Sequence, residues 1–167
     1  MNTRPVIYIY TDGAASGNPG PGGYGAVLKC GPNEKELSGG FRLTTNNRME
    51  LLAVIKALET IRWQHAEIEV FSDSAYVVNA VNKGWLAGWE KKGWNKVKNP
   101  DLWQRFLPLY RAHNVQFNWI KGHNGHPENE RCDRLAVKAY QEGPLLIDKT
   151  YESLANASAE DSQPIFD

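Results

Sequence analysis

Cysteine is scarce in this sequence, with only Cys30 and Cys132 among 167 residues. The two stand far apart and neither belongs to a C-x-x-C pair, so the sequence gives no support to a disulfide framework or a cysteine-based zinc site. We therefore expect two reduced thiols.

Long apolar runs are also missing. No run approaches the roughly 20 residues that span a bilayer, and the opening MNTRPVIYIYTDG has no apolar segment ahead of a small-residue cleavage site. We expect no membrane association and a cytoplasmic location.

The sequence has no net charge, because 19 lysines and arginines balance 19 aspartates and glutamates. The charges are unevenly placed, however. Residues 83–98, called the basic segment here, contain five lysines and a single acid, Glu90. Residues 148–167 contain five acids and a single basic residue, Lys149. The basic segment is thus suited to phosphates, whereas the acidic end is typical of a poorly ordered tail.

The length and composition indicate one globular domain, since 41% of the residues are hydrophobic and six are tryptophans. We expect this domain to cover residues 1–143, including the basic segment, and to be followed by the acidic tail over residues 144–167. No internal repeat is present. A monomer without an obligate protein partner is the simplest expectation.

The sequence pattern predicts an α/β fold. A β-branched run at residues 6–11 and two further runs separated by Gly and Pro turns predict three antiparallel strands. Strands at 67–73 and 115–122 follow, and helices are expected at 48–62, 74–81, 99–113 and 129–141, the third interrupted or bent near Pro108. This order predicts a mixed five-stranded sheet with helices on both faces.

Four acids stand where side chains commonly converge: Asp12 and Asp73 at strand ends, Glu50 and Asp133 in helices. Three of them also have structural explanations. Asp12 could open a turn, Asp73 could cap a helix, and Glu50 could form a capping box with Asn47.

Asp133 is harder to explain structurally, because residues three, four and seven positions further on are apolar and place it on an apolar helix face. An ionised carboxylate is costly to bury unless it is paired or binds a metal. Several carboxylates could share hard cations such as Mg²⁺, and two such ions about 3.5 to 4 Å apart can promote phosphodiester hydrolysis. Spacing alone leaves open whether the four acids meet.

Two histidines lie in the segment GHNGHP, at positions 123 and 126. H-x-x-H without cysteine partners is a weak zinc signal, and a surface loop is the plainer reading. A glycine-flanked histidine can also carry protons near neutral pH.

The basic segment interleaves lysines with Trp85, Trp89 and Trp94. Such tryptophans usually form a small satellite core. They can do so while the lysines neutralise phosphates and an exposed indole packs on a sugar or base.

Five long blocks, in order, resemble bacterial type 1 ribonuclease H, and the likeness extends to about Tyr140: YTDGAASGNPGPGGYGAVL, TTNNRMELLAVIKALE, FSDSAYVVNAV, NPDLWQRF and WIKGHNGHPENERCDRLA. The resemblance implies the ribonuclease H-like fold and catalysis by Asp12, Glu50, Asp73 and Asp133. These four would hold two Mg²⁺ ions, with Mn²⁺ as a possible substitute, and His123 rather than His126 would assist as a mobile group.

The same resemblance implies an RNA–DNA hybrid as partner. Gly13, Asn18, Asn46 and Asn47 would lie along the minor groove and sense ribose 2′-hydroxyls. Thr45 resembles a contributor to a phosphate pocket. The basic segment resembles the family's substrate-binding handle, which grips the DNA strand, with contacts expected from Trp85, Trp89, Lys91, Lys92 and Lys96.

The implied reaction is endonucleolytic hydrolysis of the RNA strand by a two-metal-ion mechanism, leaving 5′-phosphate and 3′-hydroxyl ends. One alternative is a hybrid-binding module without turnover, which the presence of all four acids disfavours. Another is a phosphotransferase of the actin-like group, but its second nucleotide-binding domain has no room in this chain.

The basic segment departs from the family in two ways. Gly88 stands where better-known members carry an asparagine, and the stretch after Trp94 is shorter and has fewer lysines. We therefore predict weaker or more salt-sensitive hybrid binding than in members with the longer loop, because fewer phosphates are contacted. A salt titration of both proteins tests this, and unchanged binding would contradict it.

Overall fold

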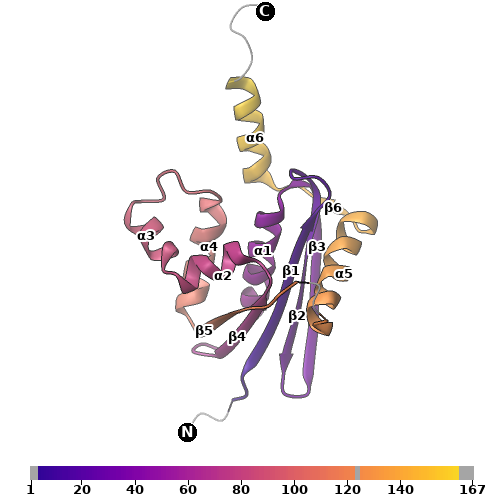
Figure 1. The fold of residues 1–167 in the computed structure, drawn as a ribbon, viewed down its shortest axis with the longest axis vertical. Coiled ribbons are helices and arrows are strands. Elements are labelled where there is room, and N and C mark those ends of the chain that lie inside the picture. The colour runs from indigo at the N-terminus through magenta and orange to yellow at the C-terminus, as the bar shows by residue number, and fades with distance from the viewer. Residues whose placement is uncertain (1–3, 123–124, 162–167) are drawn as a thin grey trace, which may run out of the picture.

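The computed structural model describes residues 4–122 and 125–161. Within them, one mixed sheet has the order β5-β4-β1-β2-β3-β6 (Figure 1). Strands β1, β2 and β3 are antiparallel, β4 and β5 run parallel to β1, and β6 runs parallel to β3. The strand bounds are β1 Ile7–Ala15, β2 Gly20–Cys30, β3 Asn33–Thr44, β4 Glu67–Ser72, β5 Asn114–Trp119 and β6 Leu145–Leu146.

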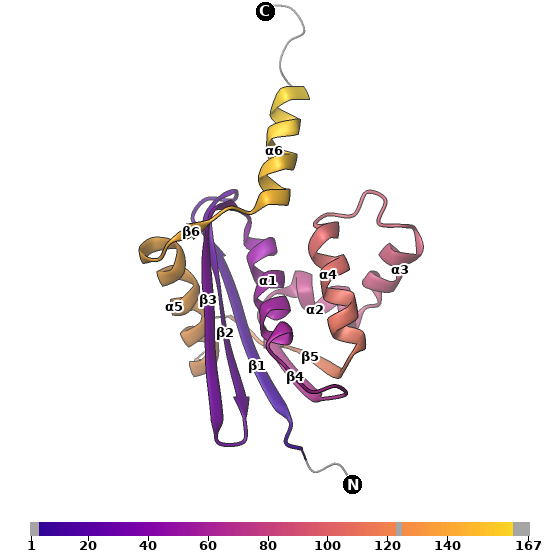
Figure 2. The same cartoon turned by 180° about the vertical axis from the view of Figure 1, so that it is seen from behind.

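Helices cover both faces of the sheet, as the sequence predicts (Figures 1 and 2). One face carries α1, α2, α3 and α4, the other carries α5, and α6 projects from the end of the molecule where β6 lies. The helix bounds are α1 Asn46–Glu59, α2 Ala75–Asn82, α3 Trp85–Lys91, α4 Pro100–Arg111, α5 Pro127–Glu142 and α6 Lys149–Asp161. No helix in the described part of the chain is long and apolar enough to span a bilayer.

Helix α1 is the centre of the core, because it lies between the sheet and α4. Met49 and Leu51 are both fully buried although, two residues apart, they lie on nearly opposite sides of the helix. An α-helix that is apolar on most sides is stable only when protein surrounds it. The predicted capping box of Asn47 and Glu50 is wrong: the N-cap is Thr45, whose side chain accepts the N–H of Arg48.

Two further expectations need correction. Residues 145–161, expected within a poorly ordered tail, form β6 and α6, so the sheet has six strands instead of five. Pairing of Leu145 with Gly40 and of Leu146 with Phe41 extends the sheet beyond β3. Helix α4 was expected to be interrupted or bent near Pro108, and the interruption is absent because the helix continues through Pro108 to Arg111.

A buried ionic network joins the start of α1 to α4 and to the segment before α6. The Arg48 guanidinium is only 2% exposed and donates to both carboxylate oxygens of Asp148, at 2.7 and 2.9 Å. It also donates to Asp101 at 2.7 and 3.0 Å and to Asn99 at 3.2 Å. Thr44 completes the cluster by donating its hydroxyl to Asp148 at 2.8 Å. One cation therefore pairs with two carboxylates from distant parts of the chain.

We predict that Arg48→Met lowers the free energy of unfolding by about 3 to 5 kcal/mol, since two partly buried carboxylates lose their cation. Urea unfolding at neutral pH measures this. Arg105→Met is the matched control, because Arg105 pairs with Glu59 at a partly exposed site and its loss should cost about 1 kcal/mol or less. Equal losses for both variants would contradict the prediction.

Candidate active site

Two of the predicted acids meet because their strands are parallel neighbours. Tyr10 of β1 is in register with Phe71 of β4. Asp12 and Asp73 each stand two residues further along the chain, so both reach the same edge of the sheet. Side chains two residues apart share one face of a strand. The alternative role of Asp73 as a helix cap is wrong, since Ser74 caps α2 by accepting the N–H of Val77.

The third acid, Glu50, comes from the first turns of α1. This helix can approach β1 because Gly13 has no side chain: a Cβ there would lie 2.4 Å from the backbone nitrogen of Glu50. Any other residue would push α1 away from the strand that carries Asp12. A glycine after Asp12 is thus required for packing. The N–H of Gly13 also donates to Asp12 Oδ1 at 2.9 Å.

Asp12, Glu50 and Asp73 each place one carboxylate oxygen within 4.8 Å of the others. Asp12 and Glu50 are each only 5% exposed. The Oε2 atom of Glu50 is buried without a hydrogen-bond partner in the described part of the chain. An unsatisfied buried acceptor is costly, so this arrangement favours a bound cation.

The electrostatics of the cluster resist ionisation. Burial raises the pKa of Asp12 to about 7, with a further increase from the charge of Asp73 and partial relief from a hydrogen bond with Glu50. Burial also raises the pKa of Glu50 well above its ordinary value, and the charges of Asp12 and Asp73 add to this. Without a cation, the cluster therefore holds protons that exposed carboxylates would release.

The donor set fits a hard divalent cation. Carboxylate oxygens are the ligands that Mg²⁺ prefers, and oxygens from three segments of the chain converge here. A cation would pair with the orphaned oxygen of Glu50 and relieve the repulsion between the acids. Asp12, Glu50 and Asp73 are therefore the residues that would hold the metal on which this kind of site depends.

Asp133 lies outside this tight group. It is half-buried on α5, and its charge contributes to the raised pKa of Asp12, so it lies close to the cluster without joining it. The preceding residue holds α5 against β1, since Cys132 Sγ contacts the carbonyl oxygen of Tyr10 at 3.2 Å. A fourth metal ligand at Asp133 stays a prediction.

His123 lies outside the described residues, so its expected role stays a prediction. The residue before it is placed, however: a Cβ on Gly122 would lie 2.6 Å from Oδ2 of Asp73. Gly122, the residue before His123, therefore lies directly beside the carboxylate cluster. His126 is exposed at the N-cap position of α5 and makes no capping hydrogen bond there.

The residues predicted to contact the minor groove lie near the start of α1. Asn18 Oδ1 accepts the N–H of Asn46 at 3.0 Å, which ties the β1–β2 turn to the helix. Asn47 is exposed in the first turn and Thr45 is half-buried at the cap. Their contact with nucleic acid stays a prediction. Gly13 also lies against the start of α1, because a Cβ there would meet the backbone of Met49 and Glu50.

The tryptophans of the basic segment divide into two roles. Trp89 packs edge-on against the buried Trp103 with ring centroids 5.5 Å apart, which agrees with the satellite-core interpretation. Trp85 is 42% exposed, and the Lys83 ammonium lies 5.7 Å from its ring centroid. Substrate contacts by Trp85 and Trp89 remain predictions, as do those by the exposed lysines Lys91, Lys92 and Lys96.

Gly88 occupies open space in α3, since a Cβ there would meet nothing within 4 Å. A longer side chain could stand at this position without a backbone change.

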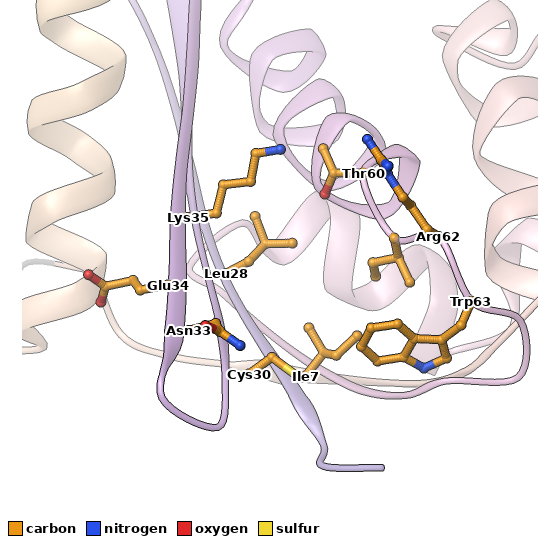
Figure 3. Close-up of a pocket in the computed structure, with 10 residues that line it drawn as sticks. Ile7, Leu28, Cys30, Asn33, Glu34, Lys35, Thr60, Arg62 and Trp63 are labelled. Atoms are coloured by element: carbon orange, nitrogen blue, oxygen red, sulfur yellow. The ribbon is translucent and has the colours of Figure 1, made fainter.

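A different cavity, of about 620 Å³, lies at the far end of β1 beside Ile7 and Trp63 (Figure 3). It begins five residues before Asp12, roughly 17 Å along the strand. Leu28 and Ile61 give it mainly apolar walls, and Glu34 is the one carboxylate among its lining residues. It therefore cannot replace the carboxylate cluster as the candidate site.

Sequence reasoning missed several residues near the site. Gly122 was read only as a loop residue, and Arg48 and Asp148 were not singled out. The available signal for Arg48 was its place directly before the apolar stretch of a helix, since a buried guanidinium requires carboxylate partners. Pairing with Asp148, however, joins residues 100 positions apart and leaves no local pattern.

We predict that Asp12→Asn stabilises the metal-free protein. The pKa of Asp12 is about 7 in the folded protein and 3.8 for an unperturbed aspartate. The free energy of unfolding therefore falls as pH rises from 3.8 to about 7, and the loss of stability is complete above pH 7. At pH 8 the variant should gain on the order of 2 kcal/mol, and at pH 4 it should gain little.

Thermal unfolding in chelator at both pH values measures this effect. Glu130→Gln, at an exposed position on α5, is the control and should change neither value. A variant that is less stable than the original protein at pH 8 would refute the prediction.

Comparisons with known proteins identify the family of this chain. The RNase H family model matches residues 4–141. Ribonuclease H from Desulforamulus reducens is 57% identical over 147 residues, which cover 85% of this chain and 92% of that protein. Ribonuclease H from Rippkaea orientalis is 54% identical over 159 residues, covering 92% and 97%.

Solved structures show the same fold. LC9-RNase H1, a type 1 RNase H with the type 2 active-site motif, aligns with a TM-score of 0.77 and 27% identity over 98% of this chain and 88% of that one. LC11-RNase H1 in complex with an RNA/DNA hybrid aligns with a TM-score of 0.59 and 31% identity over 81% and 97%. The expected ribonuclease H-like fold is confirmed, and the family match over residues 4–141 shows that this chain belongs to the ribonuclease H family.

Proposed function

We propose that this chain is an endoribonuclease that hydrolyses the RNA strand of RNA–DNA hybrids. The observation that carries the proposal is the buried cluster of Asp12, Glu50 and Asp73, whose oxygens converge within 4.8 Å. Support comes from the bacterial relatives named Ribonuclease H and from the alignment with LC11-RNase H1, which was solved with an RNA/DNA hybrid.

The proposed cofactor is Mg²⁺, with two ions during catalysis and Mn²⁺ as a possible substitute. Asp12, Glu50 and Asp73 would hold the ions, and Asp133 would complete the set from α5. When bound, the ions supply positive charge that promotes deprotonation of water and stabilises charge on the phosphate. Asp12, Glu50 and Asp73 would hold the positive charge of the ions at one edge of the sheet. The same charge would lower the pKa of these carboxylates and keep them ionised.

The proposed reaction is an in-line displacement at the RNA phosphorus. An oxygen of water forms the new bond, the bond from phosphorus to the 3′ oxygen breaks, and the products carry 5′-phosphate and 3′-hydroxyl ends. No covalent link to the protein is required. His123 is proposed to move a proton at this stage, because its loop starts beside Asp73 and an imidazole titrates near neutral pH.

Hybrid recognition is proposed to use the residues beside Glu50. Gly13, Asn18, Asn46 and Asn47 would read ribose 2′-hydroxyls in the minor groove, where such groups distinguish RNA from DNA. Thr45 would bind a phosphate. The basic segment would grip the DNA strand through its exposed lysines, with Trp85 free to pack on a sugar.

A cytoplasmic location and a monomeric state also belong to the proposal. Cys30 and Cys132 are free thiols, which agrees with a reducing compartment. Light scattering after size-exclusion chromatography measures the oligomeric state, and a stable dimer would contradict the monomer.

Incubation of a labelled RNA–DNA hybrid with protein and Mg²⁺ tests the proposed function. The protein should cut only the RNA strand and leave 5′-phosphates. Asp12→Asn should lower the rate at least about 1,000-fold, because the cluster loses a metal ligand. His123→Ala should lower it about 100-fold, which is the lower end of the usual contribution of an acid–base group.

The control variant for this assay is Glu130→Gln, which removes a carboxylate outside the cluster and should retain full activity. Hybrid binding without cleavage by the unmodified protein would favour the non-catalytic binding module instead. Equal cleavage of single-stranded RNA would contradict the hybrid specificity.

A further inference from the structure

A groove of about 550 Å³ lies beside the start of α1, and four separate segments form its walls. These segments are the β1–β2 turn, the first turn of α1, the end of the basic segment, and α6. The lining residues that bear on its chemistry are Asn18, Thr45, Lys98, Tyr151 and Leu154. Thr45 stands five residues before Glu50, about 7.5 Å along the helix axis, so the groove lies close to the carboxylate cluster.

Three of the residues that line the groove offer hydrogen-bond donors. Thr45 Oγ1 accepts the N–H of Arg48 at 3.2 Å, which leaves its hydroxyl proton to donate. Asn18 uses its carbonyl oxygen to accept the N–H of Asn46, so its amide group keeps two N–H donors. Lys98 adds an exposed ammonium. Hydroxyl, amide and ammonium donors together are suited to phosphate oxygens.

The groove residues contributed by α6 are mainly apolar. Tyr151 and Leu154 are three residues apart and so lie on one face of the helix. The guanidinium of Arg48 lies 5.8 Å from the Tyr151 ring centroid, and Leu154 is 56% exposed. Hydrogen-bond donors and apolar side chains in one groove match a sugar–phosphate backbone, which has charged phosphates and apolar sugar carbons.

The base of α6 is held firmly. Asp148, immediately before the helix, makes two hydrogen bonds to the buried Arg48. Glu152 accepts three hydrogen bonds from Arg42 of β3, at 2.8 to 3.1 Å. Tyr151 and Leu154 therefore need little ordering when a ligand arrives, which favours binding.

We propose that α6 is an additional substrate-binding element, in which Tyr151 and Leu154 pack against the sugars of a nucleic-acid strand whose phosphates lie at Thr45 and Lys98. This inference rests on the proposed function and extends it to a helix beyond the residues that the RNase H family model matches.

The test uses position 154 and a matched position outside the groove. Leu154 and Leu146 are the same residue type and equally exposed, at 56%, but Leu146 lies in β6 and does not line the groove. Leu154→Ala and Leu154→Glu are compared with Leu146→Ala and Leu146→Glu in the full chain. The readouts are kcat and KM for hybrid cleavage, and hybrid binding by fluorescence anisotropy in an Asp12→Asn background.

Leu154→Ala should raise KM and the anisotropy Kd about fivefold, the effect of losing one useful interface contact. Leu154→Glu should raise both about tenfold or more, because its charge would face phosphates. In both variants kcat should stay within about twofold of the original value, since position 154 does not touch the reacting atoms. Both Leu146 variants should match the original protein.

Equal KM and Kd changes at positions 154 and 146 would overturn the inference. A lower KM for Leu154→Ala would also overturn it, because α6 would then obstruct the groove. If the original protein binds hybrid without cutting it, the proposed enzymatic function fails, and the anisotropy series still decides the role of α6. If it does not bind hybrid at all, both proposals fail.

Discussion

The confinement of three like-charged carboxylates in a buried site is the constraint on which the rest of this structure depends. Asp12 and Glu50 are almost inaccessible to solvent, and burial and mutual repulsion raise the pKa of both. Such an arrangement is stable only where rigid elements hold the carboxylates together and a cation can offset their repulsion. The sheet edge and the first turns of α1 provide that rigidity.

The start of α1 connects the catalytic and binding parts of the molecule. Within six residues, Thr45 caps the helix, Arg48 joins Asp101 and Asp148, and Glu50 enters the carboxylate cluster. A shift of this helix would therefore move the carboxylate cluster, the groove and the base of α6 together. Gly13 sets its distance from β1, because any side chain there would collide with the helix backbone.

Much of the fold could be predicted from the sequence, because local signals agreed with the final elements. Alternating and β-branched runs located the five long strands, and an apolar helical stretch located α1. The errors arose where a tertiary contact outweighed local composition. Residues 145–161 carry acids and small polar residues, yet Asp148 and Glu152 are paired with arginines far away in the chain, which orders the segment.

The sequence by itself determined the residue types of the site, the order of its elements and, through long blocks of resemblance, its family. Only the tertiary structure decided that Asp12, Glu50 and Asp73 meet while Asp133 stands slightly apart, and that α6 lines the groove beside Thr45. The reason is physical: periodicity reports which face of one element is apolar. The distance between side chains of different elements depends instead on strand register, on close backbone approach at Gly13, and on ion pairs between residues about 100 positions apart.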